Sequence, residues 1–397
     1  MRVLFFNEGN LGTYILGQSQ GDDALRAGLS AAPEVQARFV GLTPMGRWTR
    51  AAAMRSTPRL ASMNLDFRTL RWHLVQSLRA RAQLRAELRR WPADVVHVHT
   101  QSIALTMSTT MRALPVVLSI DSTVYSWSAM PAWPFRQSYA ELMLAPSRAL
   151  ERRALRGAAL VLAFTDWARR SAEHEAPGAR VITHHPGIDL RRYRPAERRE
   201  RALPRVLFVG GRFAAKGGED LLEAVGDALG RELELDIVTP EQVPARPGMR
   251  VHRLSQADPQ LLDLQQQADV MCLPTYGDTN PWALLEAMAC GTPVISTPVG
   301  GIPDMLDRGR AGVLVPYGDP RTLGEAIRAL LADPDRRAQL ADRARVRCEE
   351  QFDATLQFAK LAERLARLGD DQAGVPRRSN TRRSSTPSAR SPNSSAG

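Results

Sequence analysis

The chain is almost without lysine. Only Lys216 and Lys360 are lysines, although lysine and arginine together number 53 among 397 residues. The net charge of +11 at pH 7 therefore comes almost entirely from arginine. In such a chain, a position that keeps a lysine is a candidate for a role that arginine does not fill, because the compact ammonium group acts as a point charge.

Cysteine and long apolar runs are also scarce. The three cysteines have no metal-ligand spacing, and an odd number argues against a disulfide framework. No run reaches the roughly 18 apolar residues of a membrane-spanning helix, and the first residues lack the apolar region and cleavage site of a signal peptide. We therefore expect a protein of the reducing cytoplasm that holds no metal.

The remaining composition is that of a globular protein with extensive cores. Hydrophobic residues make up 44% of the chain and charged residues 24%. Short apolar runs alternate with helical patterns, which predicts an α/β fold with parallel sheets covered by helices. The expected strands are Arg2–Phe6, Val35–Val40, Val95–Val98, Val116–Ile120, Ala159–Ala163, Arg180–Thr183, Arg205–Val209, Glu234–Val238, Arg250–His252, Val270–Leu273, Val294–Ser296 and Val313–Val315.

A charged, apolar-poor segment at 191–204 predicts a linker between two α/β domains of similar size. We expect Rossmann-like domains at 1–198 and 199–350, and a C-terminal helix at 351–369 that packs back toward the first domain. Residues 370–397 are rich in Arg, Ser, Pro and Asn, so they predict a disordered basic tail with almost nothing to bury.

A glycine-rich turn follows the first strand of the second half. Gly210 and Gly211 end that strand, and a helix begins after Lys216. Glycines let the backbone approach a ligand closely, and a helix N-terminus favours anions. Arg212 and Lys216 bracket the turn and together suit a diphosphate. An ordinary surface turn with two solvated cations is the alternative.

A second segment places two carboxylates near one helix N-terminus. Asn280 is expected to cap a helix that starts at Pro281, and a glycine ends it. Asp278 precedes this helix and Glu286 lies on its second turn. Carboxylates accept hydrogen bonds from the paired hydroxyls of a ribose. A dipole-complementing aspartate and a solvated glutamate are the alternative.

Further ligand-binding positions are weaker. Gly300 and Gly301 follow a strand and precede a helix, so their amides are candidates for contact with phosphate or sugar. Trp282, the residue after Pro281, is assigned to the same donor-side group.

Taken together, these segments resemble the retaining glycosyltransferases of family 4, which have the GT-B fold. That family shows a strand, Gly-x-Arg and Lys-Gly, then an acidic residue, seven residues, Glu and a Gly-Gly turn. The first half of this chain matches more loosely, through the strand 94–99 and an opening glycine loop with Gly9 and Gly12.

The resemblance implies that Arg212 and Lys216 hold the diphosphate of a nucleotide-sugar donor. It also implies that Glu286 binds the nucleotide ribose and that Asp278 lies near the donor sugar. The implied reaction is a retaining, front-face transfer to a glycan, lipid-linked or small-molecule acceptor, without metal or further cofactor.

Two departures from the family pattern affect the site. The first acidic position is Asp278, one methylene shorter than the commoner Glu. After the fourth strand the family often has a histidine, whereas this chain has Asp121. His99 and Asp121 are therefore the first-domain candidates for the donor sugar, and both have a structural alternative.

Other readings remain open at this stage. An epimerase, a phosphorylase-like enzyme and a non-catalytic sugar-nucleotide-binding protein would share the donor motifs. The stretch 70–91 has arginines on one face and leucines on another, which suits either a domain helix or contact with an anionic membrane. Nucleic acid is not an expected partner, because no stacking platform or known module is present.

Overall fold

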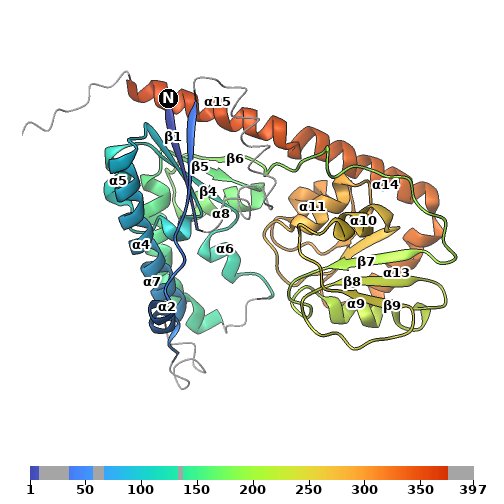
Figure 1. The fold of residues 1–397 in the computed structure, drawn as a ribbon. Coiled ribbons are helices and arrows are strands. Elements are labelled where there is room, and N and C mark those ends of the chain that lie inside the picture. The colour runs from blue at the N-terminus through green and yellow to red at the C-terminus, as the bar shows by residue number, and fades with distance from the viewer. Residues whose placement is uncertain (9–34, 57–66, 133–136, 374–397) are drawn as a thin grey trace, which may run out of the picture.

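The computed structural model describes residues 1–8, 35–56, 67–132 and 137–373. Within these ranges the chain forms two sheets of six parallel strands, side by side in Figure 1. The strands are β1 Arg2–Asn7, β2 Gln36–Gly41, β3 Val95–His99, β4 Val116–Ile120, β5 Leu160–Ala163, β6 Val181–Thr183, β7 Arg205–Val209, β8 Glu234–Val238, β9 Met249–His252, β10 Val270–Leu273, β11 Val294–Ser296 and β12 Val313–Leu314. The predicted α/β class is confirmed, and no end of an expected strand moves by more than one residue.

The first sheet has the order β2-β1-β3-β4-β5-β6. Its central strands are buried on both faces, which is why they read as continuous apolar runs. One face packs against helices of the first half of the chain. The helices of this half are α2 Arg47–Met54, α4 Arg68–Arg90, α5 Ser108–Ala113, α6 Val124–Ser128, α7 Gln137–Gly157 and α8 Asp166–Glu175, with a 3₁₀ turn at Gln101–Ile103.

Helix α4 belongs to the core of the first domain. Ala80 and Leu84 are fully buried against the sheet. Arg81 and Arg85 donate to a carbonyl and a hydroxyl oxygen of the neighbouring segment 106–109, at 3.4 and 2.7 Å. Much of the basic stripe predicted at 70–91 is therefore bonded within the protein, which favours the domain-helix reading.

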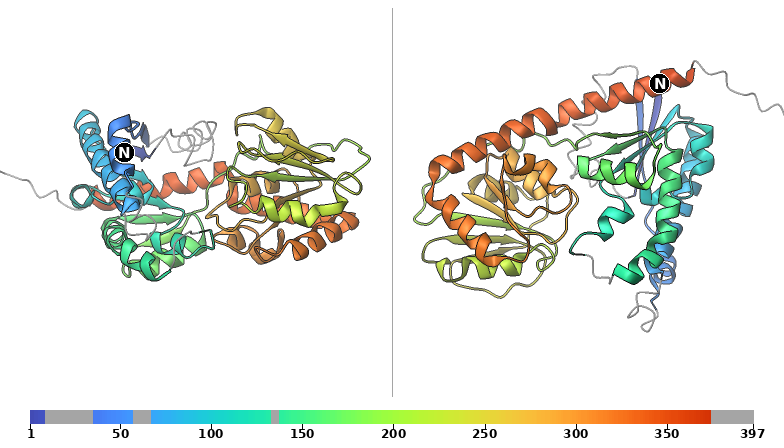
Figure 2. Two further views of the ribbon diagram at one scale, coloured as in Figure 1. Left: turned by 90° about the horizontal axis from the view of Figure 1, so that it is seen from below. Right: turned by 180° about the vertical axis from the view of Figure 1, so that it is seen from behind.

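The other face of the first sheet is covered by the last helix, α15 Ala354–Ala373. Phe358, Leu361 and Leu365 are buried against β1, β3 and β4. Figure 2 shows α15 crossing from the second domain over the first. The helix continues past residue 369, so residues 370–373, predicted to be tail, are helical. Residues 374–397 lie outside the described residues, and the disorder of the tail and the domain boundaries stay predictions.

The second sheet has the order β12-β11-β10-β7-β8-β9, the arrangement of a Rossmann domain. The chain order reverses between β7 and β10, and ligands of open α/β sheets bind outside the carboxyl ends of strands at such a point. The surrounding helices are α9 Gly218–Val225, α10 Pro259–Gln267, α11 Trp282–Ala289, α12 Ile302–Met305, α13 Pro320–Ala332 and α14 Pro334–Arg347, followed by a π-helical turn at Cys348–Phe352. Short 3₁₀ turns occur at Gly226–Ala228 and Asp307–Gly309.

All three cysteines of the chain are free and buried. Burial raises the pKa of each thiol, that of Cys348 to about 12. Over the described ranges, no helix combines the length and the apolarity needed to cross a membrane.

Candidate functional site

The glycine-rich turn lies at the switch point of the second sheet, between the ends of β7 and β10. Gly217 has a φ of 76°, and a Cβ there would lie 2.0 Å from the carbonyl oxygen of Pro274. A Cβ on Gly210 would lie 2.9 Å from the ring of Phe208. Only glycine allows this approach. The turn is thereby pressed onto the loop that follows β10 and carries Asp278.

The two cations of this turn are held differently. Lys216 is largely buried, donates from Nζ to the carbonyl oxygen of Gly277 at 3.1 Å and forms an ion pair with Asp278. Arg212 is exposed, and its guanidinium makes no hydrogen bond or ion pair with the described residues. The lysine is therefore fixed on the Asp278 loop, while the arginine next to it is available to a ligand.

The helix after Asp278 begins later than expected. Helix α11 starts at Trp282 with Pro281 as its N-cap, so the prediction that Asn280 caps it is wrong. The Asp278 side chain instead accepts from the backbone N–H of Asn280 at 3.2 Å. The Asn280 amide is 7% exposed, and neither of its polar atoms has a partner in the described part of the chain. Pro281 has a ψ of 111°, in the extended region, so the helical backbone begins only at Trp282.

Residues of the glycine turn and of the Asp278 loop line a pocket of about 360 Å³ at the carboxyl ends of β7, β8 and β10. Its volume lies within the range of small-molecule sites. Its polar lining includes Lys216, Thr239, Asp278 and Asn280. Its apolar lining includes Val209, Val238, Leu254, Leu261, Leu273, Pro281 and Trp282. The pocket thus has a charged end beside an apolar wall, which suits a nucleotide with its phosphates at the glycine turn.

Gly300 and Gly301 pack against the loop that carries Asp278. A Cβ on Gly300, whose φ is 57°, would lie 1.8 Å from the carbonyl oxygen of Asp278. The N–H of Gly301 donates to the carbonyl oxygen of Thr279 at 3.1 Å. In this arrangement the glycine pair packs against the Asp278 loop, and the Gly301 amide is already bonded. Their predicted contact with a ligand stays a prediction.

Glu286 lies one turn deeper in the protein than the pocket wall. Its position on α11 is four residues after Trp282, on the same helix face. The side chain is 2% exposed and is not part of the pocket lining. Its two oxygens accept from Tyr193 and Gln265 at 3.2 and 2.7 Å.

The first domain reaches the same loop through Asp121. Its Oδ2 accepts from the hydroxyl of Thr279 at 3.1 Å, across the domain boundary. A second bond joins Ala132 N–H to the carbonyl oxygen of Tyr276 at 2.9 Å. The structure therefore brings Asp121 next to the Asp278 loop, although the two residues are far apart in sequence.

The base of the segment that carries Asp121 is fixed by a buried carboxyl group. Glu151 is 1% exposed and accepts from the N–H of Val124 and the amide of Gln101. Burial raises its pKa to about 7. The same Gln101 amide donates to the carbonyl oxygen of Ser122 at 2.7 Å, so Glu151 and Gln101 hold the segment 121–124 from inside the domain.

His99 does not share the environment of Asp121. It is 2% exposed and stacks on the ring of Phe164, with centroids 5.5 Å apart. Burial lowers its pKa to about 4 and that of His97 to about 3. Both imidazoles are therefore neutral at physiological pH.

Sequence reasoning missed two carboxylates, one directly after β1 and one bonded to the glycine turn. Glu8 follows β1 at the switch point of the first sheet, where burial raises its pKa and Ser102 donates to it at 2.9 Å. Glu241 accepts from the N–H of Phe213 in the glycine turn, at 3.0 Å. The position of Glu8 at the end of the first strand was the available signal. Gly9 and Gly12, which come next, lie outside the described residues.

Two Rossmann-like domains, with a glycine turn, a lysine and an acidic loop at the second switch point, define a protein of the GT-B class. A model described as Glycosyltransferase Family 4 matches residues 35–192, and one described as Glycosyl transferases group 1 matches residues 203–333. The chain belongs to this family of glycosyltransferases. The predicted resemblance is thereby confirmed.

Two similar curated proteins are named D-inositol 3-phosphate glycosyltransferases. The chain is 33% identical over 197 residues to D-inositol 3-phosphate glycosyltransferase 2 of Catenulispora acidiphila, which covers 42% of this chain and 46% of the relative. It is 33% identical over 219 residues to D-inositol 3-phosphate glycosyltransferase of Thermobispora bispora, covering 48% and 51%. The matches thus span about half the length of these relatives.

Solved structures show the same fold at lower identity. Sucrose-phosphate synthase from Thermosynechococcus elongatus superposes with a TM-score of 0.68 at 17% identity, over 92% of this chain and 100% of that one. HepE of Anabaena in complex with UDP-glucose superposes with a TM-score of 0.63 at 15% identity, over 92% and 100%. At these identities the likeness establishes the GT-B fold alone.

Proposed function

We propose that the protein is a retaining glycosyltransferase that moves a sugar from a nucleotide-sugar donor to an acceptor hydroxyl. One observation carries the proposal. Lys216, one of only two lysines, stands on a glycine turn at the Rossmann switch point and is held against Asp278 at the charged end of the pocket. Family membership and this geometry point to the same donor site.

In this reaction Arg212 and Lys216 would stabilise the leaving diphosphate. The exposed Arg212 and the bonded Lys216 supply two positive charges beside the N-terminus of α9. Such preorganised charges act where negative charge develops in the transition state. Asp278 pairs with Lys216, and its neighbour Thr279 bonds to Asp121 of the first domain, which supports a role for Asp278 in orienting the donor sugar. The leaving diphosphate assists a front-face transfer that keeps the anomeric configuration.

We also propose that no metal or further cofactor takes part. The two cations and the helix N-terminus offer the charge that Mg²⁺ would otherwise supply to a diphosphate. Across the ranges that the structure describes, no group of three or more His, Cys, Asp or Glu side chains suits a metal ion. Activity should therefore persist in EDTA, and loss of transfer that Mg²⁺ or Mn²⁺ restores would reject the metal-free mechanism.

The names of the similar proteins suggest which substrates to try first. Relatives are named for D-inositol 3-phosphate, and a neighbouring structure holds UDP-glucose. The acceptor class remains a glycan, a lipid-linked acceptor or a small molecule. UDP-glucose with D-inositol 3-phosphate is therefore the first pair, followed by ADP- and GDP-sugars and by acceptors without phosphate.

A product assay tests the function directly. Purified protein is incubated with each donor and acceptor, and the products are separated and their anomeric configuration is determined by NMR. Transfer with retained configuration supports the proposal. An epimerised donor, a phosphorolysis product or tight binding without any reaction would instead support an epimerase, a phosphorylase-like enzyme or a binding protein.

For a membrane contact, α2 is the better candidate than α4. Only Ala53 of this helix is buried, whereas Trp48 and Met54 are 75% and 43% exposed. Arg47 and Arg50 lie on the same helix, and exposed apolar groups beside arginines suit an anionic surface. We propose a cytoplasmic protein that touches the inner membrane face through α2. Co-sedimentation with anionic but not neutral vesicles, weakened by Trp48→Ala, is the expected result.

A further inference from the structure

The first domain contacts the Asp278 loop on both sides of that residue in the sequence. Before Asp278, the N–H of Ala132 donates to the carbonyl oxygen of Tyr276 at 2.9 Å. After it, the hydroxyl of Thr279 donates to Oδ2 of Asp121 at 3.1 Å. Asp278 therefore lies between two hydrogen bonds that cross the domain boundary.

The two domains are closely packed at Gly277, between these bonds. A Cβ on Gly277 would lie 2.7 Å from the Cβ of Ala132 and 3.6 Å from that of Met130. The shorter of these distances is well inside the contact distance of two carbon atoms, so a side chain here would push the first domain away. The segment 121–132 is thus in direct contact with the loop that carries Asp278.

The segment 121–132 is itself fixed within the first domain. The side-chain amide of Gln101 bonds both Glu151 and the carbonyl oxygen of Ser122, at 3.1 and 2.7 Å. The Ser122 hydroxyl in turn donates to Oδ1 of Asp121 at 2.9 Å. One carboxylate oxygen of Asp121 is therefore oriented by the first domain, and the other bonds the second domain.

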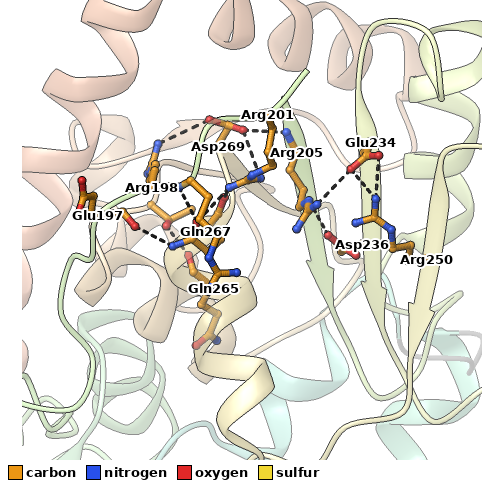
Figure 3. Close-up of polar contacts among 12 residues, drawn as sticks. Glu197, Arg198, Arg201, Arg205, Glu234, Asp236, Arg250, Gln265, Gln267 and Asp269 are labelled. Carbon is orange, nitrogen blue, oxygen red and sulfur yellow. Dashed lines mark hydrogen bonds and ion pairs between the residues drawn. The ribbon is translucent and has the colours of Figure 1, made fainter. Parts of the chain in front are cut away.

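The linker between the domains bonds the opposite end of β10. Arg198 and Arg201 of the linker lie beside Asp269, at 3.8 and 4.0 Å (Figure 3). Asp269 directly precedes β10, whereas the Asp278 loop follows the carboxyl end of this strand. The linker therefore anchors the amino end of β10, and the segment 121–132 contacts the loop at its carboxyl end.

Resting on the proposed function, we propose that Asp121 and Thr279 are positioning residues, which hold Asp278 in place for the donor sugar. The carboxylate of Asp121 acts on the reaction through the Thr279 hydroxyl and not by contact with the sugar. Every residue that lines the pocket belongs to the second domain. Binding of the nucleotide therefore does not need the bond between Asp121 and Thr279, whereas transfer of the sugar does.

The test removes this bond from each side. Thr279→Val replaces the donor hydroxyl by a methyl group, Asp121→Ala removes the acceptor, and the double variant removes both. Thr279→Ser keeps the hydroxyl and is the conservative rescue. Thr292→Val is the matched control, because its buried hydroxyl bonds the carbonyl oxygen of Gln265 within the second domain, at 2.6 Å. For each variant we would measure kcat with UDP-glucose, or with the ADP- or GDP-sugar that the wild type uses, calorimetric affinity for the nucleoside diphosphate, and melting temperature.

We expect Thr279→Val and Asp121→Ala each to lower kcat by about tenfold, the scale of one hydrogen bond to a charged group. Affinity for the nucleoside diphosphate should stay that of the wild type. The double variant should be no slower than the slower single variant, because both changes remove the same bond. Thr279→Ser should retain most of kcat, and Thr292→Val should lower the melting temperature without changing kcat.

Three results would contradict these expectations. Wild-type kcat in a folded Thr279→Val protein would overturn the inference and leave the proposed function standing. A far larger loss in Asp121→Ala, added to that of Thr279→Val in the double variant, would also overturn it, because that pattern indicates direct contact of Asp121 with the sugar. If the wild-type protein binds none of UDP, ADP and GDP and transfers no sugar, the proposed function fails and the inference with it.

Discussion

At the scale of single residues, Lys216 is the group from which most of the donor site follows. Its ammonium group is bonded to Gly277 and paired with Asp278, so it fixes the acidic loop as well as offering charge to a ligand. Lys216→Ala should weaken nucleoside diphosphate binding by about 10- to 100-fold, because it removes charge-assisted hydrogen bonds. Calorimetry with the nucleotide measures the change.

The chain offers a matched control for this variant. Lys360 is the other lysine, and it lies on α15, away from the pocket lining. Lys360→Ala should leave affinity unchanged. Wild-type affinity in a folded Lys216→Ala protein would refute the assignment of the diphosphate site.

The site residues that could be predicted from the sequence are those that belong to short local motifs. The glycine turn and the Asp278 loop were readable because each motif lies within a few residues. The cap at Asn280 was predicted wrongly, since Pro281 has an extended backbone conformation and is itself the N-cap. The bond from Thr279 to Asp121 and the bond from Tyr193 to Glu286 join residues more than 90 positions apart, and no local pattern announces such pairs.

At the scale of elements, the C-terminal helix α15 packs on the first sheet and so joins the end of the chain to the N-terminal domain. Leu365 has no exposed surface and packs on the first sheet, whereas Leu356 on the same helix is 37% exposed. Leu365→Ala should destabilise the protein by about 2–5 kcal/mol, the usual cost of such a cavity. Leu356→Ala should have a much smaller effect in the same denaturation experiment.

The predicted tail gives the contrasting result. Removing residues 374–397 should leave the melting temperature nearly unchanged, because this composition has little to bury. A large fall after this truncation would contradict the tail prediction.

Strands were easier to predict than helix ends for a physical reason. A parallel strand buried on both faces must be apolar throughout, so the ends of the apolar run predict the ends of the strand. A helix end depends on caps and on neighbours, as the extension of α15 to Ala373 shows. The packing of that helix on β1 and β4 depends on residues more than 200 positions away, which composition does not disclose.

At the scale of the whole molecule, Asp304 joins the two domains. Its carboxylate accepts from the N–H of Trp167 at 2.6 Å, at the N-terminus of α8, and lies 3.7 Å from Arg170. Asp304→Ala should loosen this contact, because the first turn of α8 loses an anionic partner. We expect a larger radius of gyration in solution scattering and slower turnover, with nucleotide affinity retained.

A carboxylate that bonds within one domain serves as the comparison. Among the residues that the structure describes, Glu325 pairs only with Arg321 on its own helix, so Glu325→Ala should change neither quantity. Loss of nucleotide affinity in Asp304→Ala would show that the contact acts on the donor site rather than on domain placement.

Because all three native thiols are buried, dyes can be attached selectively to cysteines introduced on the surface. A maleimide dye reacts with an accessible thiolate, and here burial both hides the sulfur atoms and raises their pKa. Cysteines introduced at Leu142 on α7 and at Tyr317 beyond β12, which are 62% and 47% exposed, would therefore be the reactive ones. A dye pair at these two positions would report the distance between the domains in the wild-type background, as donor and acceptor substrates are added.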